Sequence, residues 1–210
     1  MTATDDSGYA SLTDEELVRR DGDGDTSAFD MLIDRHASRI LGFLFRSTGD
    51  RALSEDLLQE TFLKAFRNRR GWRGESRFST WLVQIARNLL IDRFRWMGRW
   101  RSVSIDEMDT QPERAIRSGD PSPEEAALRR ERHDELRAAI LRLPERQREV
   151  LLLSRYCDMS YAEIARLTGV TEDAIKQLAY RGVLALRRDL TGSGEAKDGV
   201  EPTPLRRKRS

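Results

Sequence analysis

The sequence predicts an all-α protein of two small helical domains joined by a flexible linker, the second containing a helix-turn-helix. Apolar residues recur at three- and four-residue spacing through most of the chain, and no strand-length run alternates apolar with polar residues. A stretch rich in Pro, Gly, Ser and acidic residues interrupts this spacing in the interior. Of the 210 residues, 35% are charged and 38% hydrophobic, which suits small bundles better than one large core.

An acidic N-terminal segment with a short helix is predicted over residues 1–24, and the first domain over residues 25–99. Three apolar stripes predict its three helices, the first with Asp25 as its N-cap. The stripes are Ala28, Phe29, Leu32, Ile33, His36, Ile40, Phe43 and Leu44; then Leu53, Leu57, Leu58, Phe62 and Ala65; then Phe78, Trp81, Leu82, Ile85 and Leu89. Short turns that contain Gly separate the stripes, which is typical of a compact helical bundle.

The flexible linker is predicted over residues 100–122, where Gln111-Pro112 and Ser118-Gly119 interrupt the helical spacing. The second domain is predicted over residues 123–190. It begins with a helix from 124 to about 143, which stops at Pro144. A helix through Val150, Leu151 and Leu153 follows, and then two helices over 161–168 and 172–190. Residues 191–210 are predicted to form a disordered tail.

The segment from Tyr161 to Arg181 has the pattern of a helix-turn-helix. Gly169 stands where the chain leaves the first helix with positive φ, and Thr171 is placed to cap the second, for about 1 kcal/mol. The apolar residues spaced to fill the angle between the helices are Ile164, Val170, Ile175 and Leu178. The second helix of such a motif lies in the major groove, where its polar side chains are Lys176, Gln177, Tyr180 and Arg181. An ordinary helix hairpin without DNA contact is the alternative.

The net charge of +1 conceals a strong segregation of charge. Residues 61–101 hold 11 bases and two acids, whereas residues 1–60 hold 14 acids and six bases. The basic stretch interleaves arginines with aromatic residues, a pattern that suits phosphates and unstacked bases. Phe78 and Trp81 are expected in the core because they lie on a stripe. Trp72 lies in a loop between glycines, where it either stacks on a base or anchors the loop. A solvated basic face is the plainer reading of the whole stretch.

Other features limit the class of protein. The single cysteine, Cys157, excludes an internal disulfide and a multi-cysteine zinc site, and no leader or membrane-spanning run is evident, which points to the reduced cytoplasm. An enzyme such as a nuclease is the weaker alternative. Asp21, Asp23 and Asp25 resemble a calcium loop, but Thr26 and Leu32 occupy the positions of its required Gly and Glu. We therefore expect no metal, no cofactor and no catalytic residue.

Five short motifs, in order, carry a resemblance to a known family. They are Asp56–Phe62 (DLLQETF), Phe78–Leu82 (FSTWL), Ile85–Asn88 (IARN), Leu143–Gln147 (LPERQ) and Tyr161–Ala165 (YAEIA). Together they resemble the extracytoplasmic-function (ECF) subfamily of bacterial RNA polymerase sigma factors, over about residues 25–190. The resemblance implies a first domain that melts the promoter, called region 2, and a second domain, region 4, that reads an upstream element.

The resemblance also implies roles for individual residues. Asp56, Gln59 and Glu60 match the helix that docks on the clamp helices of the largest polymerase subunit. Trp72, Arg73, Ser76, Arg77, Arg87 and Asn88 match the part that recognises and melts the −10 element. Thr171, Lys176, Gln177, Tyr180 and Arg181 match the part that reads the −35 element. Leu178 stands where the family usually has Arg, so one DNA contact is missing. The implied partners are core RNA polymerase, promoter DNA both double- and single-stranded, and an anti-sigma factor, with no direct insertion into a membrane.

Simple estimates of distance and free energy agree with a protein that opens DNA only together with polymerase. The 23-residue linker reaches roughly 75 Å, more than the roughly 55 Å between the two elements of the family's promoters. Opening about a dozen base steps costs roughly 17 kcal/mol, and capturing two or three bases returns at most about half of that. Polymerase must therefore supply the rest. The alternative function is an autonomous helix-turn-helix regulator, which would bind duplex DNA by itself.

Overall fold

The computed structural model describes residues 6–98 and 123–192, and every regular element within them is helical. The elements are α1 (Asp6–Ala10), α2 (Asp14–Gly22), α3 (Thr26–Thr48), α4 (Arg51–Asn68), the 3-10 helix η1 (Arg69–Gly71), α5 (Phe78–Trp96), α6 (Pro123–Arg142), α7 (Glu145–Leu151), the π-helical turn η3 (Leu152–Tyr156), α8 (Tyr161–Thr168) and α9 (Glu172–Gly192). The predicted linker and most of the predicted tail lie outside the described residues. The first two residues of that tail, Thr191 and Gly192, belong to α9.

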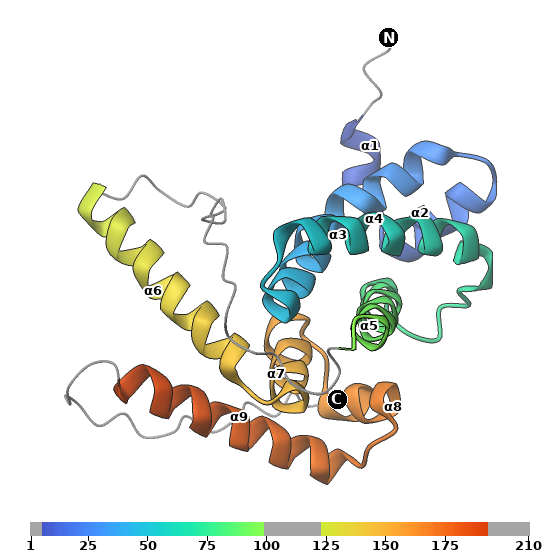
Figure 1. Ribbon diagram of the computed structural model, residues 1–210. Coiled ribbons are helices and arrows are strands. Elements are labelled where there is room, and N and C mark those ends of the chain that lie inside the picture. Colours follow the sequence, from blue (N-terminus) through green and yellow to red (C-terminus); the bar gives the residue numbers. More distant parts are fainter. Residues whose placement is uncertain (1–5, 99–122, 193–210) are drawn as a thin grey trace.

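The N-terminal lobe, defined as α1 to α5, is built on the three predicted stripes. Helices α3, α4 and α5 pack against one another around a core that contains Leu32, Phe43, Leu57 and Leu82, all at most 1% exposed (Figure 1). Asp25 occupies the N-cap position of α3, but its side chain makes no cap hydrogen bond. It accepts a 2.8 Å hydrogen bond from the Tyr9 hydroxyl instead, so the predicted capping interaction is wrong.

Helix α2 is fastened to α3 by charged side chains. Asp14 accepts a 2.7 Å hydrogen bond from Arg35 and lies 2.7 Å from the imidazole Nε2 of His36. Burial raises the pKa of Asp14, but the hydrogen bonds to His36 and Arg35 outweigh it, so the net shift of this pKa is downward. Thr13 and Glu16 form a capping box that starts the helix. The N-terminal segment thus contains two described helices where one was expected.

The C-terminal lobe, defined as α6 to α9, holds a second set of buried residues. Helix α6 ends before Pro144, as predicted, and the buried Arg148 donates a 2.9 Å hydrogen bond to the Leu141 carbonyl near that end. The sequence pattern did not predict η3, in which the Cys157 N–H donates to the Leu152 carbonyl five residues earlier. Burial raises the pKa of the Cys157 thiol to about 12.

The two lobes touch. Helix α3 of the N-terminal lobe packs against α6 and η3 of the C-terminal lobe, and α7 lies beside α5 (Figure 1). A cavity of about 30 Å³ remains between α3, α5 and α7. Among the described helices none is long and apolar enough to cross a membrane.

Candidate functional site

The loop from Trp72 to Arg77 is anchored at its start by two contacts. Arg69, in η1, forms an ion pair with Asp21, whose carboxylate is fully buried. The indole of Trp72 lies edge-on to the Phe78 ring, with 5.6 Å between their centroids, and is half-buried. Trp72 therefore anchors the loop in this conformation, one of the two roles expected for it, and Phe78 is in the core as predicted. The pairing of Asp21 with Arg69 also gives this acid a structural role.

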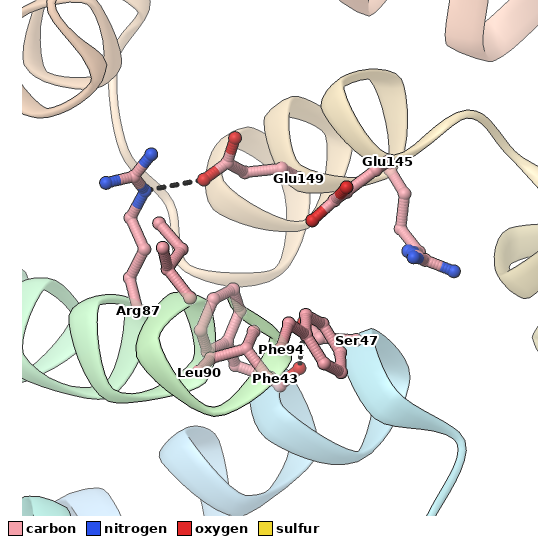
Figure 2. Close-up of a pocket in the computed structure, with 9 residues that line it drawn as sticks. Phe43, Ser47, Arg87, Leu90, Phe94, Glu145 and Glu149 are labelled. Atoms are coloured by element: carbon pink, nitrogen blue, oxygen red, sulfur yellow. Dashed lines mark hydrogen bonds and ion pairs between the residues drawn. The ribbon is translucent and has the colours of Figure 1, made fainter. Parts of the chain in front are cut away.

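The polar residues of the predicted −10 surface differ in accessibility. Arg73, Ser76 and Arg77 are exposed on the loop, and Asn88 is exposed in the middle of α5. Arg87 is not free, because its Nε donates a 2.5 Å hydrogen bond to Glu149 of α7 and its side chain is only 14% exposed. Figure 2 shows Arg87 reaching across from α5 to Glu149, above the apolar side chains of α5 and α3. The structure thus leaves four of these five polar residues exposed and engages Arg87 with the C-terminal lobe.

A groove between α3 and α4 accompanies the residues predicted to bind polymerase. It has a volume of about 480 Å³ and is lined by Thr26, Phe29, Asp30, Ile33, Gln59, Phe62, Leu63 and Phe66. Gln59 lies at this groove, while Asp56 and Glu60 are exposed on the same helix. Leu63 is 56% exposed and Phe66 38% exposed, so the groove combines an apolar floor with a polar rim. Such a surface suits a helix of another protein.

The helix-turn-helix is formed by α8 and α9 as the sequence predicted. Gly169 has φ 70°, the left-handed conformation that ends α8. Thr171 accepts a 3.4 Å hydrogen bond from the Ala174 N–H at the start of α9. Ile164 and Ile175 are at most 1% exposed where the helices meet, and Leu178 packs partly buried against the same core. The apolar side chain at position 178 therefore contributes to packing.

The polar residues of α9 project from the opposite face. Gln177, Tyr180 and Arg181 are exposed, Tyr180 by 67%. Lys176 is also exposed, and its Nζ lies 3.0 Å from Glu172 and 3.3 Å from Asp173. Hydrogen bonds to Glu172 and Asp173 raise the pKa of Lys176 and keep it cationic. These two acids compete with a phosphate for the Lys176 ammonium group.

Comparisons with known proteins agree with this arrangement. The family model of Sigma-70 region 2 matches residues 32–100 and that of Sigma-70 region 4 matches residues 133–186. The RNA polymerase sigma factor CarQ of Myxococcus xanthus is 35% identical, over 81% of this chain and 93% of CarQ. The ECF RNA polymerase sigma factor SigX of Bacillus subtilis is 31% identical, over 77% of this chain and 83% of SigX. This chain belongs to the ECF family of RNA polymerase sigma factors.

Two further matches extend the comparison. The ECF sigma factor BldN of Streptomyces coelicolor is 37% identical over 82% of this sigma factor, which covers 64% of BldN. The sigma factor RpoE of Bartonella quintana, solved in complex with the anti-sigma factor NepR, has a TM-score of 0.62 at 22% identity. It covers 78% of this chain and 96% of its own, a likeness that shows the fold alone.

The resemblance inferred from the motifs is therefore confirmed, as are the all-α fold and the two sigma-factor domains. The chain is a promoter-recognising sigma factor. The autonomous regulator is not favoured, because region 2 is matched as well as region 4.

Sequence reasoning passed over two features of this sigma factor. Ser160 and Glu163 form a capping box at the start of α8, which the Ser-x-x-Glu spacing could have revealed. Trp96, the last residue of α5, is 83% exposed. It lies eight residues after Asn88, which places both on one face of the helix about 12 Å apart. In the sequence, the position of Trp96 at the end of the arginine-rich stretch could have indicated that it is a site residue.

Proposed function

We propose that this sigma factor acts through three surfaces: the α3–α4 groove for core polymerase, the loop and exposed face of α5 for the −10 element, and α9 for the −35 element. The single observation that supports this most strongly is that most residues of the three predicted sets are exposed, one set on α4, one on the loop and α5, and one at α9. Each face has the chemistry of its ligand. The sigma factor is then a non-catalytic adaptor that works where polymerase works, in the cytoplasm.

The polymerase surface consists of Asp56, Gln59 and Glu60 beside the exposed Leu63 and Phe66. The apolar groove supplies area that a partner helix can bury, and the acids supply attraction for basic residues on that helix. We propose that the clamp helices of the largest polymerase subunit occupy this groove.

Co-purification with core polymerase tests this surface. The double variant Asp56→Arg/Glu60→Arg is expected to reduce recovery of polymerase at least about tenfold, because two exposed acids of α4, the helix that forms one wall of the groove, become cations. Glu15→Arg is the matched control, since Glu15 is an exposed acid on α2 and not on α4. Equal recovery of polymerase by the double variant and the control would remove the docking assignment.

The −10 surface consists of Trp72, Arg73, Ser76, Arg77, Arg87 and Asn88, and we add Trp96. The exposed residues Gln84, Asn88, Asp92 and Trp96 follow one another along one face of α5. An amide can hydrogen-bond an unstacked base, and an indole can stack on one. Because Trp96 ends α5 and the helix with the −35 surface follows it in the sequence, we place Trp96 at the upstream edge of the melted segment.

The −35 surface consists of Lys176, Gln177, Tyr180 and Arg181, with Thr171 capping the helix that carries them. Exposed amide and guanidinium groups are suited to base edges and phosphates in the major groove. Permanganate footprinting of a promoter with holoenzyme tests the whole proposal. We expect melting with polymerase and none with the isolated sigma factor; melting or strong specific duplex binding without polymerase would contradict it.

An anti-sigma factor is the further partner that we propose. The support is the likeness of the fold to RpoE, solved with NepR, and to CnrH, solved with the cytosolic domain of CnrY. A cytosolic partner that covers the α3–α4 groove would compete with polymerase. Competition between the two for this sigma factor, measured by co-purification, tests the idea.

A further inference from the structure

Helix α2 contacts the segment that leads into the −10 loop, the name we give to residues Trp72–Arg77 between η1 and α5 (Figure 1). The contact is an ion pair between Asp21, in the last turn of α2, and Arg69, the first residue of η1. The Asp21 side chain is fully buried and that of Arg69 is 18% exposed, so solvent screens the pair little. The pair therefore joins α2 to the start of the loop across 48 positions of the chain.

Further contacts hold Arg69 in one orientation. Its Nη1 donates a 2.5 Å hydrogen bond to the Phe66 carbonyl, and its guanidinium lies 3.7 Å from the centroid of the Phe66 ring. The carbonyl of Arg69 accepts a 3.2 Å hydrogen bond from the Trp72 N–H. Arg69 thus connects three segments, which are α2, the end of α4 and the first residue of the −10 loop.

The ion pair adds little net stability to α2. Asp21 lies near the C-terminus of that helix, where the macrodipole disfavours a carboxylate. Within the described residues its Oδ1 is buried and has no hydrogen-bond partner, so only one of its two oxygens is satisfied. A buried ion pair of this kind stabilises no better than two apolar side chains, yet losing one partner leaves the other charge buried and unpaired. Breaking the pair from either side therefore favours separation of α2 from η1.

The position of the Trp72 indole depends on the same anchor. Its Nε1–H is buried and donates to no acceptor in the part of the chain that the structure describes. The ring packs edge-on against Phe78, so its position rests on packing and on the backbone that Arg69 holds. Exposed polar side chains follow Trp72 in the loop, among them Arg73 and Arg77. A displacement at Arg69 would move them as well.

We propose that Asp21 is a positioning residue for the −10 loop. It acts through Arg69: the carboxylate holds the guanidinium, and Arg69 fixes the backbone at Trp72, from which the exposed polar side chains of the loop follow. Asp21 precedes residues 32–100, which match Sigma-70 region 2, so the loop depends on a helix that lies before that match. The effect on promoter opening rests on the proposed function, whereas the effect on the conformation of the loop does not.

Fluorine NMR of the full chain labelled with 5-fluorotryptophan tests the positioning. The chain contains four tryptophans, and Trp72→Phe identifies the Trp72 signal by its loss. In the wild type we expect the Phe78 ring to shift this signal away from its value in the unfolded protein. Asp21→Leu and Arg69→Leu should each move the signal towards the unfolded value, because each variant leaves one charge unpaired.

The double variant Asp21→Leu/Arg69→Leu should restore the wild-type signal. Two apolar side chains fill the buried contact and leave no unpaired charge. Recovery in the double variant identifies the pair, since damage elsewhere in the fold would not recover. Circular dichroism checks that helical content is kept. If Asp21→Leu loses it, the isosteric Asp21→Asn takes its place, with the same expected shift.

Leu17→Ala is the matched control. Leu17 is fully buried one turn earlier on α2, so this variant weakens the packing of the helix but keeps both charges of the pair. It should unfold at a lower temperature than the wild type, yet below that temperature its Trp72 signal should stay in place. An equal shift in Leu17→Ala and Asp21→Leu would mean that Asp21 only supports the fold.

Permanganate footprinting with saturating core polymerase tests the effect on DNA. Each single variant of the pair should open a promoter about tenfold less than the wild type, because misplacing a functional group by about 1 Å can cost up to about a hundredfold. The double variant and Leu17→Ala should open it like the wild type. Recovery of core polymerase by Asp21→Leu should equal that of the wild type, since Asp21 is on α2 and not on α3 or α4, which form the groove.

The outcomes separate the positioning of the loop from the function proposed for it. An unmoved Trp72 signal in both single variants, or a double variant no closer to the wild type than they are, would overturn the positioning. If the signal moves and recovers as expected, but neither the single variants nor Arg77→Ala alters promoter opening, the proposed function fails at this loop. If Arg77→Ala reduces opening and Asp21→Leu does not, the proposed function stands and Asp21 is not a positioning residue.

Discussion

On the N-terminal lobe, Arg87 is paired with Glu149 and Trp72 packs on Phe78, whereas on α9 the side chains of Gln177, Tyr180 and Arg181 extend into solvent. We propose that both surfaces bind DNA, and on the second it is Lys176 that is paired, with Glu172 and Asp173 of its own helix. The first holds its aromatic and one of its cations against protein. The difference indicates that the downstream surface needs a rearrangement, driven by polymerase, that the upstream surface does not need.

The largest effect is expected from weakening the packing of α8 against α9, the helix that carries the proposed −35 surface. Ile175 is 1% exposed between α8 and α9, and Ile175→Ala should reduce the free energy of unfolding of the C-terminal lobe by about 2–5 kcal/mol. Urea unfolding followed by circular dichroism measures this. Val183→Ala, at a residue that is 44% exposed on the same helix, is the control and should cost far less. Similar losses in the two variants would mean that Ile175 does not join the helices.

Removing one cation from the proposed −35 surface should weaken promoter binding without unfolding the C-terminal lobe. Arg181→Ala should cost about 1–3 kcal/mol in binding to the upstream element, or roughly 5- to 150-fold. Open-complex formation by holoenzyme, titrated on duplex promoter, measures the loss. Arg188→Ala, at an exposed position two turns further along α9, is the control. A loss as large for Arg188→Ala would show that the effect is a general one of charge.

Trp96 provides the corresponding test on the downstream surface. Trp96→Ala should weaken open complexes by about 1–3 kcal/mol, because a stacking platform is removed at the upstream edge of the melted segment. Permanganate reactivity at that edge measures the effect. Trp96→Phe keeps an aromatic face and should retain most of the activity. If Trp96→Ala opens the promoter as well as the wild type, the exposed indole has no part in melting.

The smallest effect is expected in the chemical modification of the Cys157 thiol, which lies beside the contact between the two lobes. Burial raises the pKa of Cys157 to about 12, so at pH 8 only about one thiol in 10⁴ is ionised. Because the raised pKa disfavours the reactive thiolate, native protein should remain unmodified by iodoacetamide over an hour, as measured by intact mass. Urea-unfolded protein should be modified completely. Rapid labelling of the native chain would mean that this side of the C-terminal lobe is open to solvent.

The sequence pattern predicted the scaffold of this sigma factor well, because local rules govern it. The stripes through Leu32, Leu57 and Leu82 became the core, Pro144 ended a helix, and Gly169 adopted the left-handed conformation. Each of these follows from spacing or from the conformational preference of one residue. Most of the predicted site residues are exposed, apart from Trp72 and Arg87, and the roles of all of them stay predictions.

Contacts between distant residues were beyond the reach of such rules. Nothing in the spacing of Arg87 or Glu149 shows that they pair across 62 positions. Likewise, Asp25 was expected to cap α3, but the Tyr9 hydroxyl binds its carboxylate instead. Trp72 has no periodic neighbours in the sequence, and only the fold places Phe78 beside it. Tertiary packing decides what these polar and aromatic groups contact, and a single chain gives no sign of it.

The number of residues in the π-helical turn η3 determines whether the side chain of Tyr156 points toward α3. Its carbonyl groups bond five residues ahead, so the turn contains one residue more than an α-helical turn. Deleting a single residue such as Ser154 would return the turn to ordinary helical phase and rotate Tyr156 by about 100°. The phenol would then point away from α3. The angular register between the halves thus depends on the count of residues in one turn, and a one-residue deletion there would change it more than most substitutions on the surface.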